Sequence, residues 1–263
     1  MSIYHHFSLD EREWVDRVLD WKNQVKTAYI MKRTPFLNPR EQYIVECVIG
    51  ASDTVQIFKN KEFEGLERQR FILAPSFYEI HPEDFHVSLL QISYPTKFHT
   101  LKHSQVLGAC MNLGIKRQML GDILVVDKRI QIIAAKEIVP FVYTHLTMIH
   151  HVKVNITEIT FSERLKPKEV WKEEQTTISS RRLDIIVSKV AKLSRQKAQD
   201  LIEKEYVQVN YQICVKPDRL IQTGDFLSIR KAGRVKIKSF LEKTKKESRR
   251  PSGLRKTSPN SNS

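Results

Sequence analysis

The chain has 263 residues, of which 41% are hydrophobic, and a formal net charge of +14 at pH 7. This apolar content is typical of folded cores and excludes a globally disordered protein, and the length leaves room for two or three domains. The apolar stretch IQIIAAKEIVPFVYTHLTMI is broken by Lys136, Glu137 and Pro140, and residues 1–17 lack an apolar run behind a basic start. We therefore expect neither a membrane span nor a secretory signal.

An amphipathic helix is predicted over residues 10–30. Trp14, Val18, Trp21, Val25 and Tyr29 recur there at three- and four-residue steps, which gives one apolar face.

A second helix is predicted to start at Asn38 and Pro39 and to stop near Gly50. Asparagine is a favoured N-cap, and proline loses nothing at the first helical position, where its missing N–H would have no partner. Residues 54–58 alternate and predict a short strand or edge. Together these segments predict a mostly helical domain over residues 1–75.

Residues 76–160 are predicted to form a ferredoxin-like or RRM-like domain. Strands are expected over residues 85–93, 121–126, 129–135 and 152–159, and helices over residues 103–115 and 136–149. Asp127 and Lys128 predict a tight turn between the second and third strands, and Pro140 lies in the first turn of the second helix, where proline is tolerated. The order β-α-β-β-α-β is the split βαβ arrangement, which specifies architecture better than activity.

The positive charge is concentrated in the last third of the chain. Residues 181–250 carry a net charge of +11, whereas residues 1–180 carry only +1. Such a local excess is typical of a segment that binds a polyanion, although a basic surface kept for solubility is the alternative interpretation. The polar residues 161–180 predict a linker before this segment, and residues 241–263 predict a disordered basic tail after it.

Residues 181–240 predict a compact module of two amphipathic helices followed by strands. The apolar residues expected to face its core are Leu183, Ile186, Val187, Val190, Leu193, Ala198, Leu201, Ile202, Val207, Val209, Val235 and Ile237. Ser194 is suited to cap the second helix, whose N-terminus favours phosphate through its N–H groups and dipole. The cations Arg234, Lys236 and Lys238 alternate with the inward residues of the last strand.

Four short motifs follow one another in this module. They are Arg182-Leu183-Asp184, Ser194-Arg195, Val207-Gln208-Val209-Asn210 and Gly224-Asp225. The combination resembles the signature of the S4 RNA-binding domain, although Glu205 and Tyr211 stand where that family usually has glycine.

The resemblance implies a surface that faces RNA backbone, in which Asp184 either takes part or orients Arg195 or a neighbouring cation. Together with the outward cations of the module, the residues expected to bind RNA are Arg181, Arg182, Asp184, Lys189, Lys192, Ser194, Arg195, Lys197, Gln199, Lys204, Asn210, Arg234, Lys236 and Lys238.

A wider resemblance covers nearly all of the chain except the tail. The segments FLNPREQ, FHVSLLQI and HSQVLGACMNLGIKRQMLGDI are similar to the N-terminal and middle parts of YlmH-type S4 proteins. This resemblance implies an α+β protein of the bacterial cytoplasm. It also implies binding of the large ribosomal subunit, its rRNA and tRNA, in rescue or quality control of stalled translation, with no membrane and no small-molecule substrate.

Two histidine pairs are candidate metal ligands. His99 with His103, and His150 with His151, lack the third and fourth donors that a metal site needs. The three cysteines are far apart and lie among apolar residues, so we expect buried thiols in a reducing compartment. We expect no metal site and no cofactor.

Other candidate sites lie in the middle of the chain. Lys116 and Arg117 predict either a second RNA contact or a solvated loop, and Asp122 is interpreted as a turn and cap residue rather than a nucleophile. The sequence lacks the phosphate-binding, metalloprotease, nucleophile-elbow and dinucleotide motifs, so we expect no enzyme. Two alternatives stay open: an RNA-modifying enzyme of the pseudouridine-synthase type, and a structural protein that binds nucleic acid through its basic tail.

Overall fold

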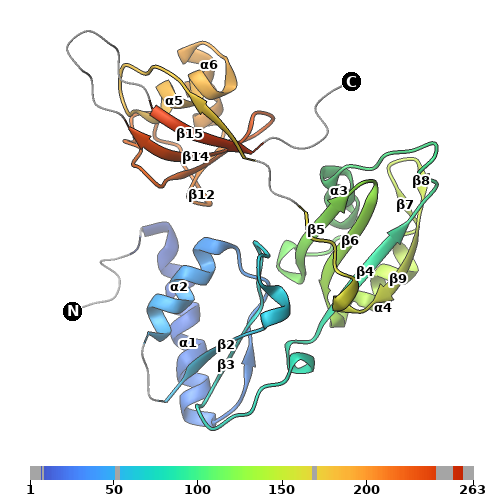
Figure 1. Cartoon of the computed structure of the whole chain (residues 1–263). Coiled ribbons are helices and arrows are strands. Elements are labelled where there is room, and N and C mark those ends of the chain that lie inside the picture. Colours follow the sequence, from blue (N-terminus) through green and yellow to red (C-terminus); the bar gives the residue numbers. More distant parts are fainter. Residues whose placement is uncertain (1–6, 8, 51–53, 168–170, 241–250, 257–263) are drawn as a thin grey trace. The chain divides into compact units, whose positions relative to one another are not determined.

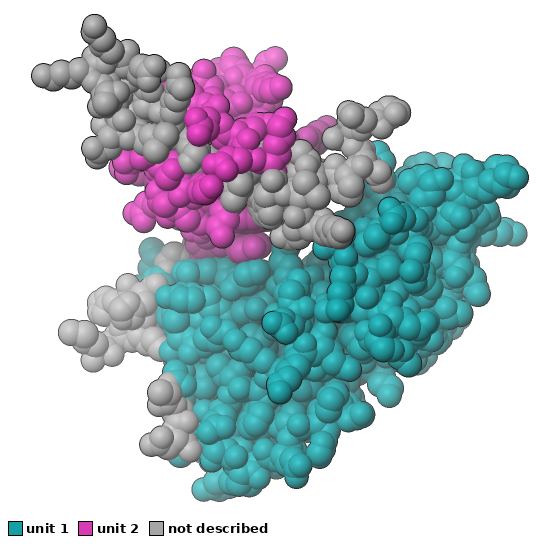
Figure 2. Space-filling model, viewed as in Figure 1, with its two compact units in different colours: residues 1–167 teal, residues 168–263 magenta. Residues whose placement is uncertain are grey.

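The computed structural model describes residue 7 and residues 9–50, 54–167, 171–240 and 251–256. The chain divides into two compact units, residues 1–167 and residues 168–263 (Figure 2). Each unit buries its own apolar side chains. The domain limits predicted from the sequence stay predictions.

The first part of unit 1 combines two helices with a small sheet. Helices α1 (Arg12–Ala28) and α2 (Pro39–Ile49) confirm the two predicted helices. Strands β1 (Lys32–Arg33), β2 (Gln56–Lys59) and β3 (Phe71–Ala74) form an antiparallel sheet in the order β1-β3-β2 (Figure 1). The predicted mostly helical segment therefore also contains a sheet. Strand β3 is buried at all four positions, and its apolar run does not by itself predict a strand, because a fully buried strand has no alternation.

The start of α2 follows the sequence prediction in detail. The side chain of Asn38 accepts hydrogen bonds from the backbone N–H groups of Arg40 and Glu41, and the Glu41 carboxylate accepts one from the N–H of Asn38. This is a capping box, with Pro39 at the first helical position. The helix ends before Gly50, whose φ of 60° lies in the left-handed region.

The second part of unit 1 has the predicted βαββαβ order. It consists of β4 (Val87–Ser93), α3 (His103–Asn112), β5 (Leu120–Val126), β6 (Arg129–Ala135), α4 (Val139–His145) and β9 (Asn155–Ile159). The sheet order β5-β6-β4-β9 places the first and third strands of the motif in the centre, all pairs being antiparallel. This is the ferredoxin-like topology, and it confirms the predicted architecture. Asp127 and Lys128 both have positive φ, as a two-residue hairpin turn of this kind requires.

One predicted helix is shorter in the structure. The helix expected over residues 136–149 ends at His145, and Met148–Ile149 form strand β7, which pairs with β8 (Val152–Lys153). The two short strands are joined through His150, whose φ of 56° belongs to a turn. An apolar run of this length does not by itself distinguish a helical end from a small hairpin.

Both faces of the four-stranded sheet are covered. On one face α3 and α4 pack on Leu90, Ile92 and Ile132 (Figure 1). On the other face, side chains from the first part of the chain, including Phe36 and Phe63, pack on residues such as Leu89, Leu124 and Ile133. Figure 2 accordingly shows unit 1 as one continuous body.

Unit 2 is a sheet with two helices against one face. Helices α5 (Leu183–Ala191) and α6 (Arg195–Glu203) share a core with β11 (Val207–Val209), β13 (Phe226–Ile229) and β14 (Gly233–Phe240). Strand β12 (Gln212–Ile213) pairs with β11. The predicted core residues at alternate strand positions are buried, among them Val207, Val209, Val235 and Ile237.

Two further strands differ from the sequence prediction. The predicted linker, residues 161–180, contains β10 (Trp171–Gln175), and the predicted disordered tail, residues 241–263, contains β15 (Pro251–Lys256). Strand β15 pairs with both β14 and β10. Main-chain pairing between strands does not require an apolar pattern, so side-chain periodicity could not reveal these strands. The rest of the predicted tail, residues 241–250 and 257–263, lies outside the described residues.

Candidate nucleic-acid interface

The first turn of α5 is anchored by a distant loop. The backbone N–H groups of Leu183 and Asp184 donate to the carbonyl oxygens of Arg219 and Pro217, at 2.9 and 3.0 Å. Arg182, the N-cap of α5, forms an isolated bridge with Leu220. These bonds hold the residues of the predicted Arg-Leu-Asp motif in one backbone conformation.

Asp184 is the centre of a polar cluster between α5 and α6. Its side chain is fully buried. One carboxylate oxygen accepts a hydrogen bond from Arg182 at 3.1 Å, and the other accepts bonds from Arg195 at 2.9 Å and Gln199 at 3.1 Å. Because Arg195 and Gln199 are four residues apart, they lie on the same side of α6 and reach the same carboxylate.

The protonation state of Asp184 follows from these partners. Burial by itself raises the pKa of the carboxyl group, but the hydrogen bonds from Arg182, Arg195 and Gln199 outweigh it and lower the pKa to about 2. The group is therefore ionised at neutral pH, and one negative charge holds two guanidinium groups. Bonding to Asp184 likewise raises the pKa of Arg182.

The two arginines stay accessible while they are held. Their side chains are 34% exposed for Arg182 and 55% exposed for Arg195. A guanidinium group has five N–H donors, and Arg195 uses its Nε toward Asp184. The cluster thus presents two cations in fixed orientations with a local net charge of +1, an arrangement suited to bind phosphate oxygens.

The other predicted helix residues are exposed but do not join this cluster. Lys192 and Ser194 lie in the connection between the helices, Ser194 caps α6 by accepting from the N–H of Lys197 at 3.3 Å, and Lys204 follows the last turn of α6. Lys189 lies roughly 140° around α5 from Asp184, at about 100° per residue. The lysines near the helix connection can extend the surface of the cluster, whereas Lys189 faces elsewhere.

The strand cations form a second surface. Arg234, Lys236 and Lys238 alternate along β14 with the buried Val235 and Ile237, so they lie on the face of the sheet that is turned away from α5 and α6.

Three further cations of the predicted set also have partners within unit 2. The Nζ of Lys238 forms an ion pair with Glu173 of β10 at 3.1 Å, and the guanidinium of Arg234 lies 5.7 Å from the Phe226 ring centroid. The guanidinium of Arg181 lies 4.8 Å from the ring centroid of Phe240. The positive charges of these three residues therefore already interact with groups of unit 2.

Asn210 holds a turn. Its side-chain amide donates to Asp225 at 2.8 Å, and its side-chain oxygen accepts from the N–H of Phe226 at 2.9 Å. These bonds tie the end of β11 to the Gly-Asp turn before β13, which gives Asn210 a structural role. Glu205 and Tyr211, at the positions where glycine was expected, have φ of 61° and 68°, so the backbone keeps the left-handed conformation without glycine.

Sequence reasoning missed the loop that anchors α5 and the ring contact that follows Asn210. Pro217 and Arg219 contribute backbone carbonyls, which leave no signal in the side-chain pattern. Tyr211 stacks on Phe226 with ring centroids 5.0 Å apart, and the only sequence signal for this contact was that both residues are aromatic.

The candidate residues of unit 1 are mostly structural. Arg117 is not part of a solvated loop, because it donates to the carbonyl oxygens of Leu120 and Gly121, and burial lowers its pKa to about 10. Asp122 lies within β5 and not in a turn before it, and it accepts hydrogen bonds from the backbone N–H groups of Glu67 and Arg68 at 2.7 and 3.0 Å, which gives it a structural role.

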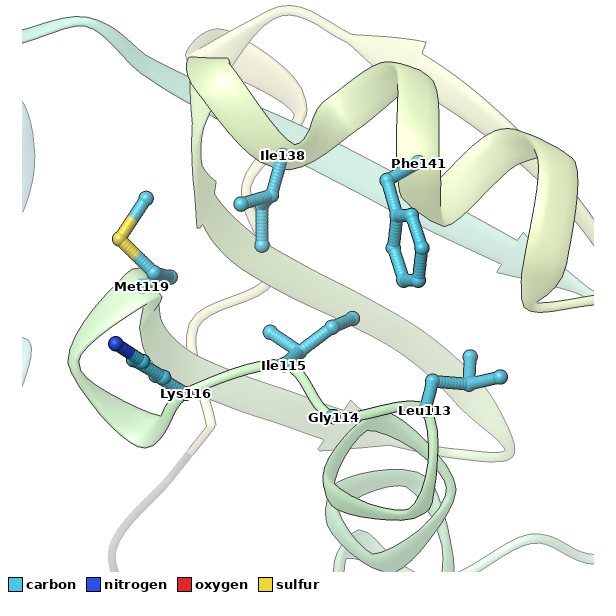
Figure 3. A pocket seen from close by; sticks show the side chains of 7 residues that line it. All are labelled: Leu113, Gly114, Ile115, Lys116, Met119, Ile138 and Phe141. Atoms are coloured by element: carbon cyan, nitrogen blue, oxygen red, sulfur yellow. The ribbon is translucent and has the colours of Figure 1, made fainter.

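A cavity of about 270 Å³ lies between the end of α3 and the start of α4 (Figure 3). Figure 3 shows Ile138 and Phe141 facing Leu113 and Ile115 across it, with Lys116 and Met119 at one side. Apolar side chains dominate the lining, and Lys116 is its one ionisable residue. This lining lacks the paired acid, base or nucleophile that catalysis of covalent chemistry would need.

Metal ligation, membrane spans and cysteine burial were further questions raised by the sequence. In the part of the chain that the structure describes, no three or more His, Cys, Asp or Glu side chains gather in a way that could hold a metal ion. No helix there is long and apolar enough to cross a membrane. Of the three cysteines, Cys110 and Cys214 are buried as expected, whereas Cys47 is exposed.

Comparison with known proteins agrees with this geometry. Residues 81–163 match the family model "Putative RNA-binding domain in YlmH", and residues 181–227 match the S4 domain model. The ribosome-associated protein quality control protein P2 of Bacillus subtilis (strain 168) is 36% identical over 246 residues, which cover 94% of this chain and 95% of that protein. The solved structure of the cell division protein ylmH from Streptococcus pneumoniae aligns with a TM-score of 0.55 and 31% identity, over 63% of this chain and 100% of that one.

Proposed function

This chain belongs to the YlmH family of S4-domain proteins, and we propose that it is a non-catalytic factor that binds rRNA and tRNA on the large ribosomal subunit. Its proposed task is the rescue or quality control of stalled translation in the bacterial cytoplasm. The name of the Bacillus subtilis relative, a ribosome-associated quality control protein, supports this assignment.

The observation that carries the proposal is the buried Asp184 with its two arginines. A carboxylate that is fully buried and ionised fixes Arg182 and Arg195, so their guanidinium groups lose little conformational freedom when they meet a phosphate. Double-stranded and folded RNA is recognised largely by its shape and its backbone, through groups held at fixed spacing. The cluster on α5 and α6 provides such groups.

The distribution of charge supports a polyanionic partner. The net charge of +11 between residues 181 and 250 is far above that of the rest of the chain. Each phosphate that the segment neutralises releases counterions, so its affinity for RNA falls steeply as the salt concentration rises.

The non-catalytic part of the proposal rests on the kind of domains present. Both family models describe RNA binding, and the cavity of Figure 3 is lined almost entirely by apolar side chains. The alternative, an RNA-modifying enzyme, is tested by the modification profile of rRNA and tRNA from a strain that lacks the protein. A missing modification that the purified protein restores would contradict the proposal.

The binding site is tested by co-sedimentation with purified large subunits. The variant Arg182→Ala with Arg195→Ala should lose most of its co-sedimentation near physiological salt. The control variant Arg12→Ala with Arg17→Ala removes the same charge from exposed positions on α1, and it should co-sediment like the unaltered protein. If the first variant is folded and still sediments like the unaltered protein, the assignment of the α5–α6 cluster is wrong.

A further inference from the structure

The four-stranded sheet of unit 1 has no open face through which it could bind RNA. RRM domains stack bases on aromatic side chains of the central strands. Here the central strands β4 and β6 carry Leu89, Ile133 and Gln131 toward the first part of the chain, and all three are buried. Gln131 donates to the carbonyl oxygen of Glu163 and accepts from the N–H of Leu165, so its amide is also engaged. Any RNA contact of this domain must therefore lie outside the two faces of the sheet.

One end of the sheet carries a rigid loop. The loop of residues 94–102 joins β4 to α3 and lies against the β5–β6 turn. The hydroxyl of Tyr94 donates to the carbonyl oxygen of Lys128 at 2.8 Å, and the Nζ of Lys128 donates to the carbonyl oxygen of Thr96 at 3.0 Å. The Tyr94 hydroxyl also accepts from the N–H of Leu101, whose side chain is buried in the core. Two hydrogen bonds thus tie the loop to the turn, and a third closes the loop on itself.

Phe98 stands at the tip of this tied loop with 77% of its surface exposed. Its backbone N–H donates to the carbonyl oxygen of Pro95 at 3.2 Å, which closes a turn around it. The Nζ of Lys97 lies 5.7 Å from the Phe98 ring centroid. An exposed phenylalanine on a mobile loop needs no explanation, but one held outward by a hydrogen-bonded loop presents its ring to solvent as a fixed flat surface.

The charges around Phe98 are almost all positive. No Asp or Glu occurs between residues 85 and 121. Lys97, Lys102, Lys128 and Arg129 are exposed on the loop and at the turn, where Asp127 is the acidic neighbour in the sequence. Among the described residues no carboxylate is recorded in an ion pair with these four cations. A ring flanked by cations matches a nucleotide, which has a flat base and an anionic phosphate.

From this arrangement we infer that Phe98, with Lys97, Lys128 and Arg129, forms a stacking site for an unpaired base of single-stranded RNA. The inference rests on the proposed function and adds to it a second contact, outside the S4 domain and distinct from the sheet face that RRM domains use. The ring stacks on one base, and the cations hold the phosphates beside it. Such a contact tolerates any base, because every base has a π face.

The test measures binding of a fluorescein-labelled, unstructured 12-nucleotide RNA to the full chain by fluorescence anisotropy. Stacking contributes about 1–3 kcal/mol per base, so Phe98→Ala should weaken binding by roughly 5- to 150-fold. Phe98→Trp should bind at least as well as the unaltered protein, whereas Phe98→Leu, which is apolar without a π face, should resemble the alanine variant. Phe77→Ala removes a phenylalanine that is 71% exposed beside Glu79 and should leave binding unchanged.

The outcomes separate this inference from the proposed function. Loss of oligonucleotide binding in Phe98→Ala, with binding kept in the Arg182→Ala, Arg195→Ala variant, supports the site. Equal oligonucleotide binding by Phe98→Ala, Phe98→Leu and the unaltered chain overturns it, even if the S4 variant still loses the ribosome. A photo-crosslinker at position 98 that captures only a ribosomal protein on purified subunits, and no RNA, overturns it as well.

Discussion

The Nε of Arg195 donates a hydrogen bond of 2.9 Å to the carboxylate of Asp184, eleven residues earlier in the chain, and this bond joins α6 to α5. The carboxylate is buried, while the Arg195 side chain remains 55% exposed. The pair therefore has a buried partner that stabilises the contact between the helices and an exposed partner that is accessible for the proposed contact with RNA.

Asp184→Asn should destabilise unit 2. The amide cannot hold two guanidinium groups as an ionised carboxylate does, and we expect a loss of about 2 kcal/mol in the free energy of unfolding. Urea unfolding at pH 7 measures it. Glu203→Gln, at an exposed position on α6, is the matched control and should change stability little.

The free energy of unfolding of unit 2 should depend on pH through Asp184. The pKa of Asp184 is about 2 in the folded protein, below the ordinary value of about 4, so the unfolded state takes up this proton first as the pH falls. The contribution of Asp184 to stability is complete above about pH 4 and is lost as the pH drops toward 2. The difference in unfolding free energy between the unaltered protein and Asp184→Asn should shrink over this range. A difference that stays constant would contradict the lowered pKa.

Arg70 should be essential for the stability of unit 1. Its buried guanidinium donates to the carbonyl oxygens of Thr34, Phe85 and His86 at 2.9, 3.1 and 2.8 Å, and it forms an ion pair with Glu137. These bonds connect the region of β1 and β3 with the segments that precede β4 and follow β6.

Arg70→Met leaves those carbonyl oxygens without their donor, and we expect a cost of about 3 kcal/mol. Arg70→Lys should rescue little of it, because an ammonium group lacks the planar fork of donors. Urea unfolding followed by tryptophan fluorescence checks both. Arg33→Met, which loses one 3.3 Å bond to the carbonyl oxygen of Asp84, serves as control, and an equal effect of Arg33→Met and Arg70→Met would argue against a special role of Arg70.

Substitution by alanine should have opposite effects on stability at Gly121 and at Gly108. A Cβ atom at Gly121 would lie 2.9 Å from both the Phe36 and the Ile133 side chains, so Gly121→Ala should cost about 1–3 kcal/mol through overpacking. At Gly108, in α3, nothing lies within 4 Å of an added Cβ, and Gly108→Ala should stabilise the helix by about 1 kcal/mol. Thermal unfolding of both variants checks the pair, and the same sign in both would contradict the close packing at Gly121.

The sequence predicted most of the architecture because its signals are local. The cap at Asn38, the turn at Asp127 and Lys128, and the alternation around Val235 each depend on neighbours along the chain. Strand β10 depends on pairing with a segment far away in the sequence. The packing of Phe36 and its neighbours on the four-stranded sheet likewise joins distant segments. No local pattern predicts either feature.

The candidate site was predicted in part. The S4 motifs contain Arg182 and Arg195, and the resemblance to the S4 family implies Gln199; the structure brings these three to one carboxylate. The strand cations, by contrast, lie on the face of the sheet that is turned away from α5 and α6. Alternation along β14 predicts that their side chains point away from the core. It does not predict whether they share a surface with the helix residues. Whether each residue touches RNA stays a prediction.

The central claim is that Asp184 holds Arg195 in place for RNA. A double-mutant cycle tests it most directly, with the dissociation constant of the full chain for purified large ribosomal subunits measured for Asp184→Asn, Arg195→Gln and the combination. We expect each single change to weaken binding by about tenfold or more, and the combined variant to bind no more weakly than Asp184→Asn alone. Losses that simply multiply, or unaltered binding in folded Arg195→Gln, would contradict the account.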